Sequence, residues 1–354
     1  MNATLQCFCQ IENLVNYFKF NRKVDDVIAA NSLYDHNKNI LTSSFKYLIE
    51  YLWPTIKEFE KKLYSQKRIN SNNVSYAPYD FKEKISDMNP LFAGTQANDS
   101  KDLVNFIIMT LHQELNDNYT NNIVSINISE QYNRNKELMF QYFYQKFKEE
   151  NKSIISDTFY AIYGSAIKCT NCNVIKYNYQ TYFFLLFPLE EVRKFKVQQN
   201  NLNIQSINFV NIYDCFEYNN RIESMDGENQ MYCNECRNNF RFLNKAFITN
   251  GPKILIILLN RGKGIQFDVK LEFYEQLNLM NFIDLKDTGV IYNLIGVVTH
   301  MGLSDASGHF IACCKSPIDE RWYKYNDDYV TPILNIKKEI IDYAMPYILF
   351  YQKQ

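Results

Sequence analysis

Four cysteines have the spacing of a metal site. Cys169 and Cys172 form one C-x-x-C pair, and Cys233 and Cys236 form a second pair further along the chain. A two-residue gap lets both thiolates of a pair face one ion, and zinc favours four such ligands in a tetrahedron. Because four cysteines leave no position for a substrate, this zinc ion (Zn2+) would stabilise structure. Two other interpretations stay open: four unrelated buried thiols, or a redox-active dithiol.

A histidine and two polar residues suggest a second kind of chemistry. Gly308 and His309 open a predicted strand, and Asn326 and Asp327 end the next one. If the two strands pair as a hairpin, His309 lies close to Asn326 and Asp327. An imidazole oriented by an amide or a carboxylate is the general base of a thiol peptidase. Gly308 would let the backbone approach a substrate closely.

Two alternatives to a catalytic His309 remain. A single histidine at the start of a strand is commonly structural when no nucleophile stands near it in the sequence. His300 is the competing histidine, because it also lies at the end of a predicted strand. It fits a hydrogen-bonded core residue equally well.

The elements that must position these residues change character along the chain. The first 150 residues favour helices, with apolar residues at helical spacing in 2–18, 41–63 and 98–116. Asp99 or Ser100 can cap the third helix. After residue 155 the composition predicts strands at Phe159–Lys168, Asn173–Leu189, Pro252–Asn260, Tyr292–Thr299, His309–Lys315 and Arg321–Tyr325. The polar stretch 194–206 is expected to be a surface loop. The predicted fold class is α+β.

The composition narrows the function classes. Hydrophobic residues make up 46% and charged residues 22% of the 354 residues, as in folded proteins. A net charge of -1 gives no basic surface for nucleic acid or for a membrane. We find neither a signal peptide nor an apolar run that could span a bilayer, so we expect a cytoplasmic or nuclear protein. The cysteines outside the quartet are expected to be small core residues: Cys7, Cys9, Cys215, Cys313 and Cys314.

In this order, over nearly the whole chain, several segments resemble the ubiquitin-specific proteases. Met1–Cys7 looks like the end of that family's cysteine box, and Asn98–Leu103 is similar to its Gln-Asp-Ala-x-Glu-Phe segment. Tyr292–Gly302 and Gly308–Phe310 resemble the histidine box, and Trp322–Val330 resembles the final box. The two cysteine pairs fall where the fingers of the family carry zinc.

The resemblance implies one papain-like catalytic domain over residues 1–354. It would consist of a helical thumb in 1–150, zinc-bearing fingers in 155–250 and a β-sheet palm in 251–354. Ubiquitin would rest on the fingers and the palm, with its C-terminal tail between the lobes.

The resemblance also assigns roles to single residues. His309 matches the general base, Asn326 matches the residue that orients it, and Asp327 matches a supporting second position. Asp99 matches a carboxylate that would meet the arginines of the ubiquitin tail. Cys169, Cys172, Cys233 and Cys236 match the zinc ligands.

The family's nucleophile has no counterpart in this sequence. It lies two residues before the position that Met1 matches, within an Asn-Thr-Cys-Tyr stretch. Cys7 and Cys9 lie at least about 12 Å further along the same predicted helix, at about 1.5 Å per residue. We therefore expect the chain as written to hydrolyse no ubiquitin substrate. Either the gene model begins at an internal Met or the chain is a natural pseudoenzyme, and the retained His309 and Asn326 favour the first explanation.

Three hypotheses of function follow. The leading one is a cysteine-type deubiquitinase that cleaves the isopeptide or peptide bond after the C-terminal glycine of ubiquitin. The second is a catalytically dead, ubiquitin-binding scaffold with the same fold. The third is a zinc-ribbon interaction protein unrelated to ubiquitin, in which His309 is incidental. Under the first hypothesis the expected partners are ubiquitin and ubiquitinated proteins, with no nucleic acid and no membrane.

Overall fold

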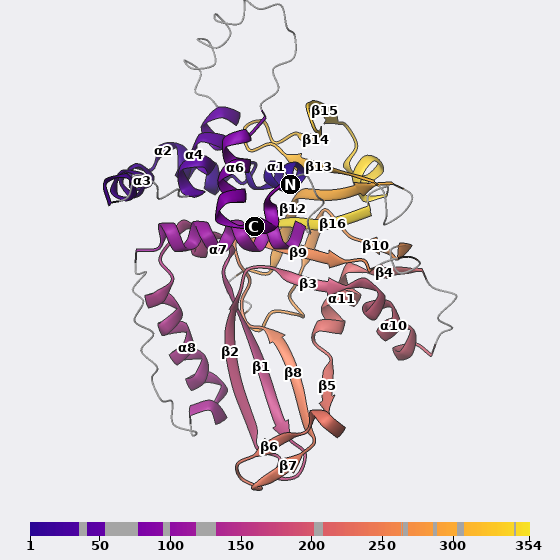
Figure 1. Cartoon of the computed structure of the whole chain (residues 1–354). Coiled ribbons are helices and arrows are strands. Elements are labelled where there is room, and N and C mark those ends of the chain that lie inside the picture. Colours follow the sequence, from indigo (N-terminus) through magenta and orange to yellow (C-terminus); the bar gives the residue numbers. More distant parts are fainter. Residues whose placement is uncertain are drawn as a thin grey trace, which may run out of the picture. The chain divides into compact units, whose positions relative to one another are not determined.

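The computed structural model describes residues 1–34, 41–53, 77–94, 100–117, 132–201, 208–262, 264, 268–285, 289–302, 308–342 and 345–354 (Figure 1). They form two compact units. The first unit comprises Met1–Asn116, Ser153–Ile155 and Phe310–Ile336, and the second comprises Asp117–Lys152, Ser156–His309 and Lys337–Gln354. Among the described residues, no helix is long and apolar enough to cross a membrane.

Helices make up most of the first unit. They are α1 (Asn2–Phe8), α2 (Glu12–Phe20), α3 (Arg22–Tyr34), α4 (Leu41–Leu52), α6 (Tyr79–Met88) and α7 (Ser100–Leu115), with a 3-10 turn at Pro90–Phe92. Buried aromatic rings join their apolar faces. The ring centroids of Phe18 and Phe45 are 5.0 Å apart, and those of Phe45 and Phe81 are 6.2 Å apart. Edge-to-face and tilted ring pairs of this kind stabilise a core beyond their buried area.

The helical pattern predicted for 2–18 is interrupted between α1 and α2. Ile11 has an extended backbone at the start of α2. The indole of Trp53 donates a 2.7 Å hydrogen bond to the Cys9 carbonyl, and the Gln10 amide donates a 3.1 Å bond to the Tyr325 hydroxyl. The indole satisfies a carbonyl at the end of α1. Tertiary partners therefore stabilise the break, and local spacing cannot reveal them.

Three antiparallel strands accompany these helices. They are β13 (His309–Lys315), β14 (Trp322–Asn326) and β15 (Tyr329–Ile333). Asn326 lies opposite Tyr329, so Asp327 and Asp328 form the turn between β14 and β15. Asp327 has a φ of 53°, in the left-handed region, which Asp tolerates better than most residues. The strand β14 also contacts α1.

A carboxylate from α7 caps the start of α4. The two oxygens of Glu114 accept hydrogen bonds from the backbone N–H groups of Leu41 and Thr42, at 2.8 and 2.7 Å. The Thr42 hydroxyl donates a third bond of 2.7 Å. The first N–H groups of a helix have no partner within the helix. Glu114, a residue of α7, therefore supplies the hydrogen-bond acceptors that a capping side chain next to the helix start normally supplies.

The second unit contains a four-stranded antiparallel sheet in the order β2-β1-β8-β5 (Figure 1). Its strands are β1 (Ala161–Cys169), β2 (Ile175–Tyr182), β5 (Ile222–Met225) and β8 (Phe242–Ile248). The ribbon of β6 (Met231–Cys233) and β7 (Asn238–Phe240) lies at the far end of these strands. Helix α8 (Lys136–Glu150) follows a 3-10 turn at Tyr132–Arg134 and packs on one face, where Met139 meets Ile162, Tyr179 and Phe247.

A second sheet in this unit has the strand order β12-β16-β9-β3. These strands are β12 (Ile291–Met301), β16 (Met345–Lys353), β9 (Ile254–Asn260) and β3 (Leu185–Pro188), and β11 (Gln276–Asn278) also pairs with β12. Every residue from Ile254 to Leu259 is buried, because β9 is an inner strand with both faces covered. The remaining elements are α9 (Ile154–Phe159), α10 (Leu189–Gln199), α11 (Ile212–Asn219), the parallel pair β4 (Phe209–Asn211) and β10 (Lys270–Glu272), a 3-10 turn at Gly227–Asn229 and a π-helical turn at Lys337–Ile341.

The α+β class predicted from the sequence is confirmed, and the division of 1–354 into thumb, fingers and palm stays a prediction. The loop predicted for 194–206 is wrong in its first part, because α10 extends to Gln199. Its buried residues are Leu189, Val192 and Val197, a sparse apolar stripe among many polar residues. Residues 202–207 and the ends of the predicted helices, 54–63 and 98–99, lie outside the described residues.

We predict that Glu114→Ala lowers the free energy of unfolding by roughly 1–3 kcal/mol, because it leaves the α4 donors without their acceptor. Urea unfolding followed by circular dichroism measures the change. Glu83→Ala is the control, since Glu83 is an exposed residue of α6 in the same unit. Equal effects of the two variants would contradict the capping role.

Candidate functional site

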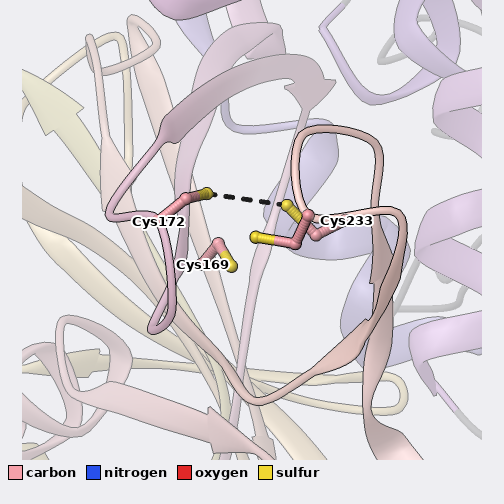
Figure 2. Close-up of side chains that lie close together, drawn as sticks. Cys169, Cys172 and Cys233 are labelled. Atoms are coloured by element: carbon pink, nitrogen blue, oxygen red, sulfur yellow. Dashed lines mark hydrogen bonds between the residues drawn. The ribbon is translucent and has the colours of Figure 1, made fainter.

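The four cysteines of the two C-x-x-C pairs meet at one point of the second unit. All four sulfur atoms lie within 4.8 Å of one another. The Sγ atoms of Cys172 and Cys233, from different pairs, are 3.7 Å apart (Figure 2). A tetrahedral zinc ion with sulfur ligands at about 2.3 Å requires sulfur–sulfur distances of about 3.8 Å. The cluster could therefore hold a zinc ion with little rearrangement.

Both pairs are presented by the same local structure. Cys169 ends β1 and Cys233 ends β6, so each pair starts where a strand stops. The residue after each second cysteine has a positive φ, 64° at Asn173 and 52° at Arg237. Its N–H donates to the carbonyl of the first cysteine, at 3.0 Å for Cys169 and 2.8 Å for Cys233. This turn reverses the chain and leaves both thiols of a pair on the same side.

The surroundings of the thiols favour at least one thiolate. Burial acts to raise the pKa of Cys233, but hydrogen bonds from the Cys236 backbone and from the other three thiols outweigh it and lower that pKa to about 7. The Asn171 side-chain amide donates a 3.3 Å hydrogen bond to the Cys236 sulfur. Zinc binds the thiolate form of cysteine, so both features suit a metal site.

Asp327, which follows Asn326 in the sequence, lies at a cavity in the first unit. The cavity has a volume of about 580 Å³ and is lined by the start of α1, including Met1, Asn2 and Leu5. Tyr325, Asp327 and Asp328 from the β14–β15 hairpin form another part of the wall. Burial and the charge of Lys82 lower the pKa of the Met1 amine, against the opposing effect of Asp327. The strand β14, which ends at Asn326, is thus packed beside the first turn of α1.

Two further contacts tie α1 to the strands of this unit. The Gln10 amide reaches the Tyr325 hydroxyl, next to Asn326 in the sequence. The buried Sγ atoms of Cys7 and Cys314 are 3.4 Å apart, which joins α1 to β13. Sequence reasoning did not find Tyr325, although an aromatic residue that precedes a polar pair at a strand end is a usable signal.

His309 and Asn326 belong to different units. His309 is the first residue of β13, it is exposed, and it belongs to the second unit, whereas Asn326 belongs to the first. The distance between their side chains therefore stays a prediction. Asp99 lies outside the described residues.

Close packing explains why residue 308 is glycine. A Cβ atom at this position would lie 1.8 Å from Nε2 of His300. His300 itself is buried near the end of β12, with its ring centroid 5.9 Å from that of Tyr347. The competing histidine is therefore in contact with the residue that precedes His309, a relation that the sequence analysis did not predict.

The five cysteines outside the cluster are all buried. Burial raises the pKa of the thiols of Cys9, Cys215 and Cys314. A nucleophilic cysteine needs an accessible thiolate. These thiols are therefore core residues, as predicted from their apolar neighbours, and they are poor candidates for a nucleophile.

Known proteins of one family are similar to this sequence over nearly its whole length. The family described as "Ubiquitin carboxyl-terminal hydrolase" matches residues 1–351. Ubiquitin carboxyl-terminal hydrolase Usp2 of Drosophila melanogaster is 23% identical over 100% of this chain and 34% of its own length. Ubiquitin carboxyl-terminal hydrolase 2 of Gallus gallus is 25% identical over 89% of this chain and 80% of its own length. The chain thus spans only about a third of the Drosophila relative.

Solved structures show the same fold. A yeast SAGA DUBm structure matches with a TM-score of 0.64 and 18% identity, covering 100% of this chain and 66% of that one. A SAGA DUB module that contains Ubp8 and is bound to ubiquitin aldehyde matches with a TM-score of 0.63 and 19% identity, covering 100% and 67%. The chain belongs to the ubiquitin carboxyl-terminal hydrolase family and has the mixed α+β fold of its ubiquitin-specific proteases.

Proposed function

We propose that this chain forms the ubiquitin-binding and proton-transfer part of a cysteine-type deubiquitinase that cleaves the bond after the C-terminal glycine of ubiquitin. One observation carries the proposal: the end of the β14–β15 hairpin, with Asp327, shares a cavity with the first turn of α1. That turn directly follows the position where the family resemblance expects the nucleophilic thiol.

In the proposed reaction, His309 takes the proton of that thiol, and the thiolate attacks the glycine carbonyl carbon. The bond from this carbon to the substrate nitrogen breaks, and the amine leaves with the proton from the imidazolium. Water then attacks the thioester, which gives the ubiquitin carboxylate and restores the thiol. Asn326 orients the imidazole, and Asp327 supports it.

The nine cysteines of this sequence do not supply the thiol. Four of them form the cluster, and five are buried. The second candidate function is a scaffold that binds ubiquitin without cleaving it. The two functions differ in whether a thiol placed ahead of Met1 is activated.

We therefore expect a chain with Asn-Thr-Cys-Tyr added directly before Met1 to form a covalent adduct with a ubiquitin C-terminal electrophile and to hydrolyse a ubiquitin-based fluorogenic substrate. The chain as written should do neither. In the extended chain, His309→Ala should lower kcat by roughly 10²–10⁴-fold, the usual contribution of a general base.

Matched variants test the orienting residue. In the extended chain, Asn326→Ala should lower kcat, whereas Asn326→Asp should retain most of it, since a carboxylate can also accept the imidazole N–H. An extended chain that binds ubiquitin but forms no adduct would support the scaffold. Turnover that survives His309→Ala would refute the assignment of the base.

The sheet β2-β1-β8-β5 offers a surface for ubiquitin. Helix α8 packs on the face that carries Ile162 and Tyr179. The opposite face presents polar side chains that are at least partly exposed, including Ser165, Asn178 and Asn244. We place ubiquitin on this polar face, because the family resemblance expects ubiquitin on the fingers; similar structures that contain Ubp8 are bound to ubiquitin.

Ser165→Arg should weaken the binding of monoubiquitin about tenfold or more, or about 1.4 kcal/mol, because it places a large charged side chain in the middle of this face. Gln141→Arg, an exposed change on α8, should leave binding unaltered. Biolayer interferometry on the chain as written measures both. Unaltered binding by the Ser165 variant would move the ubiquitin site elsewhere.

The cysteine cluster is proposed to hold a structural zinc ion. Its buried core consists of Cys169, Cys233 and Phe242, which is little apolar area for the end of a sheet. A bound ion would join the turn after β1 to the β6–β7 ribbon. Bound zinc contributes directly to the folding free energy of such small elements.

We expect one zinc ion per chain, measured by inductively coupled plasma mass spectrometry, and its loss in Cys236→Ser. The melting temperature should fall by roughly 5 °C or more, given about 2–4 °C per kcal/mol for a domain of this size. Cys215→Ala, which changes a cysteine outside the cluster, should keep its zinc. A wild-type chain that is purified without zinc would rule out the structural ion, and so would a Cys236→Ser chain that lacks zinc but melts at the wild-type temperature.

A further inference from the structure

The backbone just before His309 rests on the ring of His300. A Cβ added to Gly308 would meet three atoms of this ring, with Nε2 at 1.8 Å, Cε1 at 2.2 Å and Cδ2 at 2.9 Å. Real Cβ atoms do not approach other atoms this closely. The α-carbon of Gly308 and the imidazole of His300 are thus in direct van der Waals contact, and only glycine fits between them.

The ring of His300 packs against a residue of the neighbouring strand β16. The strand β12 pairs with β16, where His300 lies opposite Met345. The Tyr347 ring of β16 lies against the imidazole, with the planes tilted by 45°. Burial first, and the charge of Arg261 second, lower the pKa of His300, so the ring is neutral near pH 7.

Arg261 completes this support. Its side chain is buried and donates hydrogen bonds of 2.8 Å to the carbonyls of Pro346 and Val269. The guanidinium lies 5.8 Å from the centre of the Tyr347 ring. His300 is therefore a neutral ring packed between β16 and the backbone of Gly308, within one unit of the structure.

We propose that His300 is a positioning residue, whose ring sets the location of the Gly308 backbone and thereby the location of the His309 imidazole. The proposal rests on the proposed function insofar as His309 is the base. The physical reason is steric. Because His309 directly follows Gly308, the position of the Gly308 backbone sets the direction of the His309 Cα–Cβ bond. The nitrogen of a base must lie within about 3 Å of the atom whose proton it takes. A shift of about 1 Å at such a position can cost 10²-fold in rate.

A double-variant cycle tests the contact. In the thiol-extended chain, His300→Ala removes the support, so kcat should fall about tenfold or more while KM for the ubiquitin substrate stays within about twofold. Gly308→Ala should lower kcat at least as far, because its methyl group collides with the ring. In the His300→Ala background the methyl group finds space, so adding Gly308→Ala should cost little. Gly308→Ala that is equally harmful with and without His300 would overturn the proposal.

A conservative variant and a spectroscopic readout separate positioning from a general structural role. His300→Gln can place its amide where the ring Nε2 lies, so it should recover part of the kcat lost in His300→Ala. The sequence has four histidines, so their ring signals are resolvable by nuclear magnetic resonance. In the chain as written, His300→Ala should change the ring chemical shifts of His309 and increase the mobility of its side chain, and His300→Gln should change both less.

The outcomes distinguish this inference from the proposed function. If the extended chain shows no turnover, the proposed function fails, and the resonance experiment on the chain as written still tests the coupling of His300 to His309. If turnover is present but the His309 ring resonances and kcat are unaffected in a folded His300→Ala chain, the positioning role fails alone. Circular dichroism and the melting temperature establish that each variant is folded.

Discussion

The packing of α1 against the β14–β15 hairpin is the interaction on which the candidate site of the first unit depends. The family resemblance expects the thiol two residues before Met1, and the hairpin carries Asn326 and Asp327. The Gln10–Tyr325 hydrogen bond and the buried sulfur contact of Cys7 with Cys314 fix the helix on the strands. In the proposed mechanism, a displacement of α1 would move the thiol away from Asn326 and Asp327, even if each element stayed intact.

The second unit has little apolar area to bury at the end of its four-stranded sheet. A long four-stranded sheet ends in a ribbon of two very short strands, where few apolar side chains can be buried. Four thiols within 4.8 Å of one another suit an ion that replaces the missing core. Helix α8 covers one face of this sheet with aromatic side chains, and the opposite face is the one proposed for ubiquitin.

The contact between His300 and Gly308 shows how a glycine can be required without a special backbone angle. Its φ is not in the left-handed region, and the constraint is the imidazole that occupies the place of a Cβ. The proposal thus gives separate roles to the two histidines. The ring of His300 is buried, and its pKa is lowered by burial and by Arg261, which suits packing. His309 is exposed, which suits proton transfer.

The amino-acid sequence by itself determined the α+β class, most strands of the second half and the cysteine quartet, because strand composition and C-x-x-C spacing are local properties. It also pointed to His309, Asn326 and Asp327 through the order of motifs along the chain. Only the tertiary structure decided where α1 ends, that α10 is a helix, that Glu114 caps α4 and that His300 packs on Gly308. Each of these depends on residues far apart in sequence, such as Cys9 with Trp53 or Glu114 with Thr42. Local periodicity carries no information about such partners, since the free energy that selects them arises only when the chain is folded.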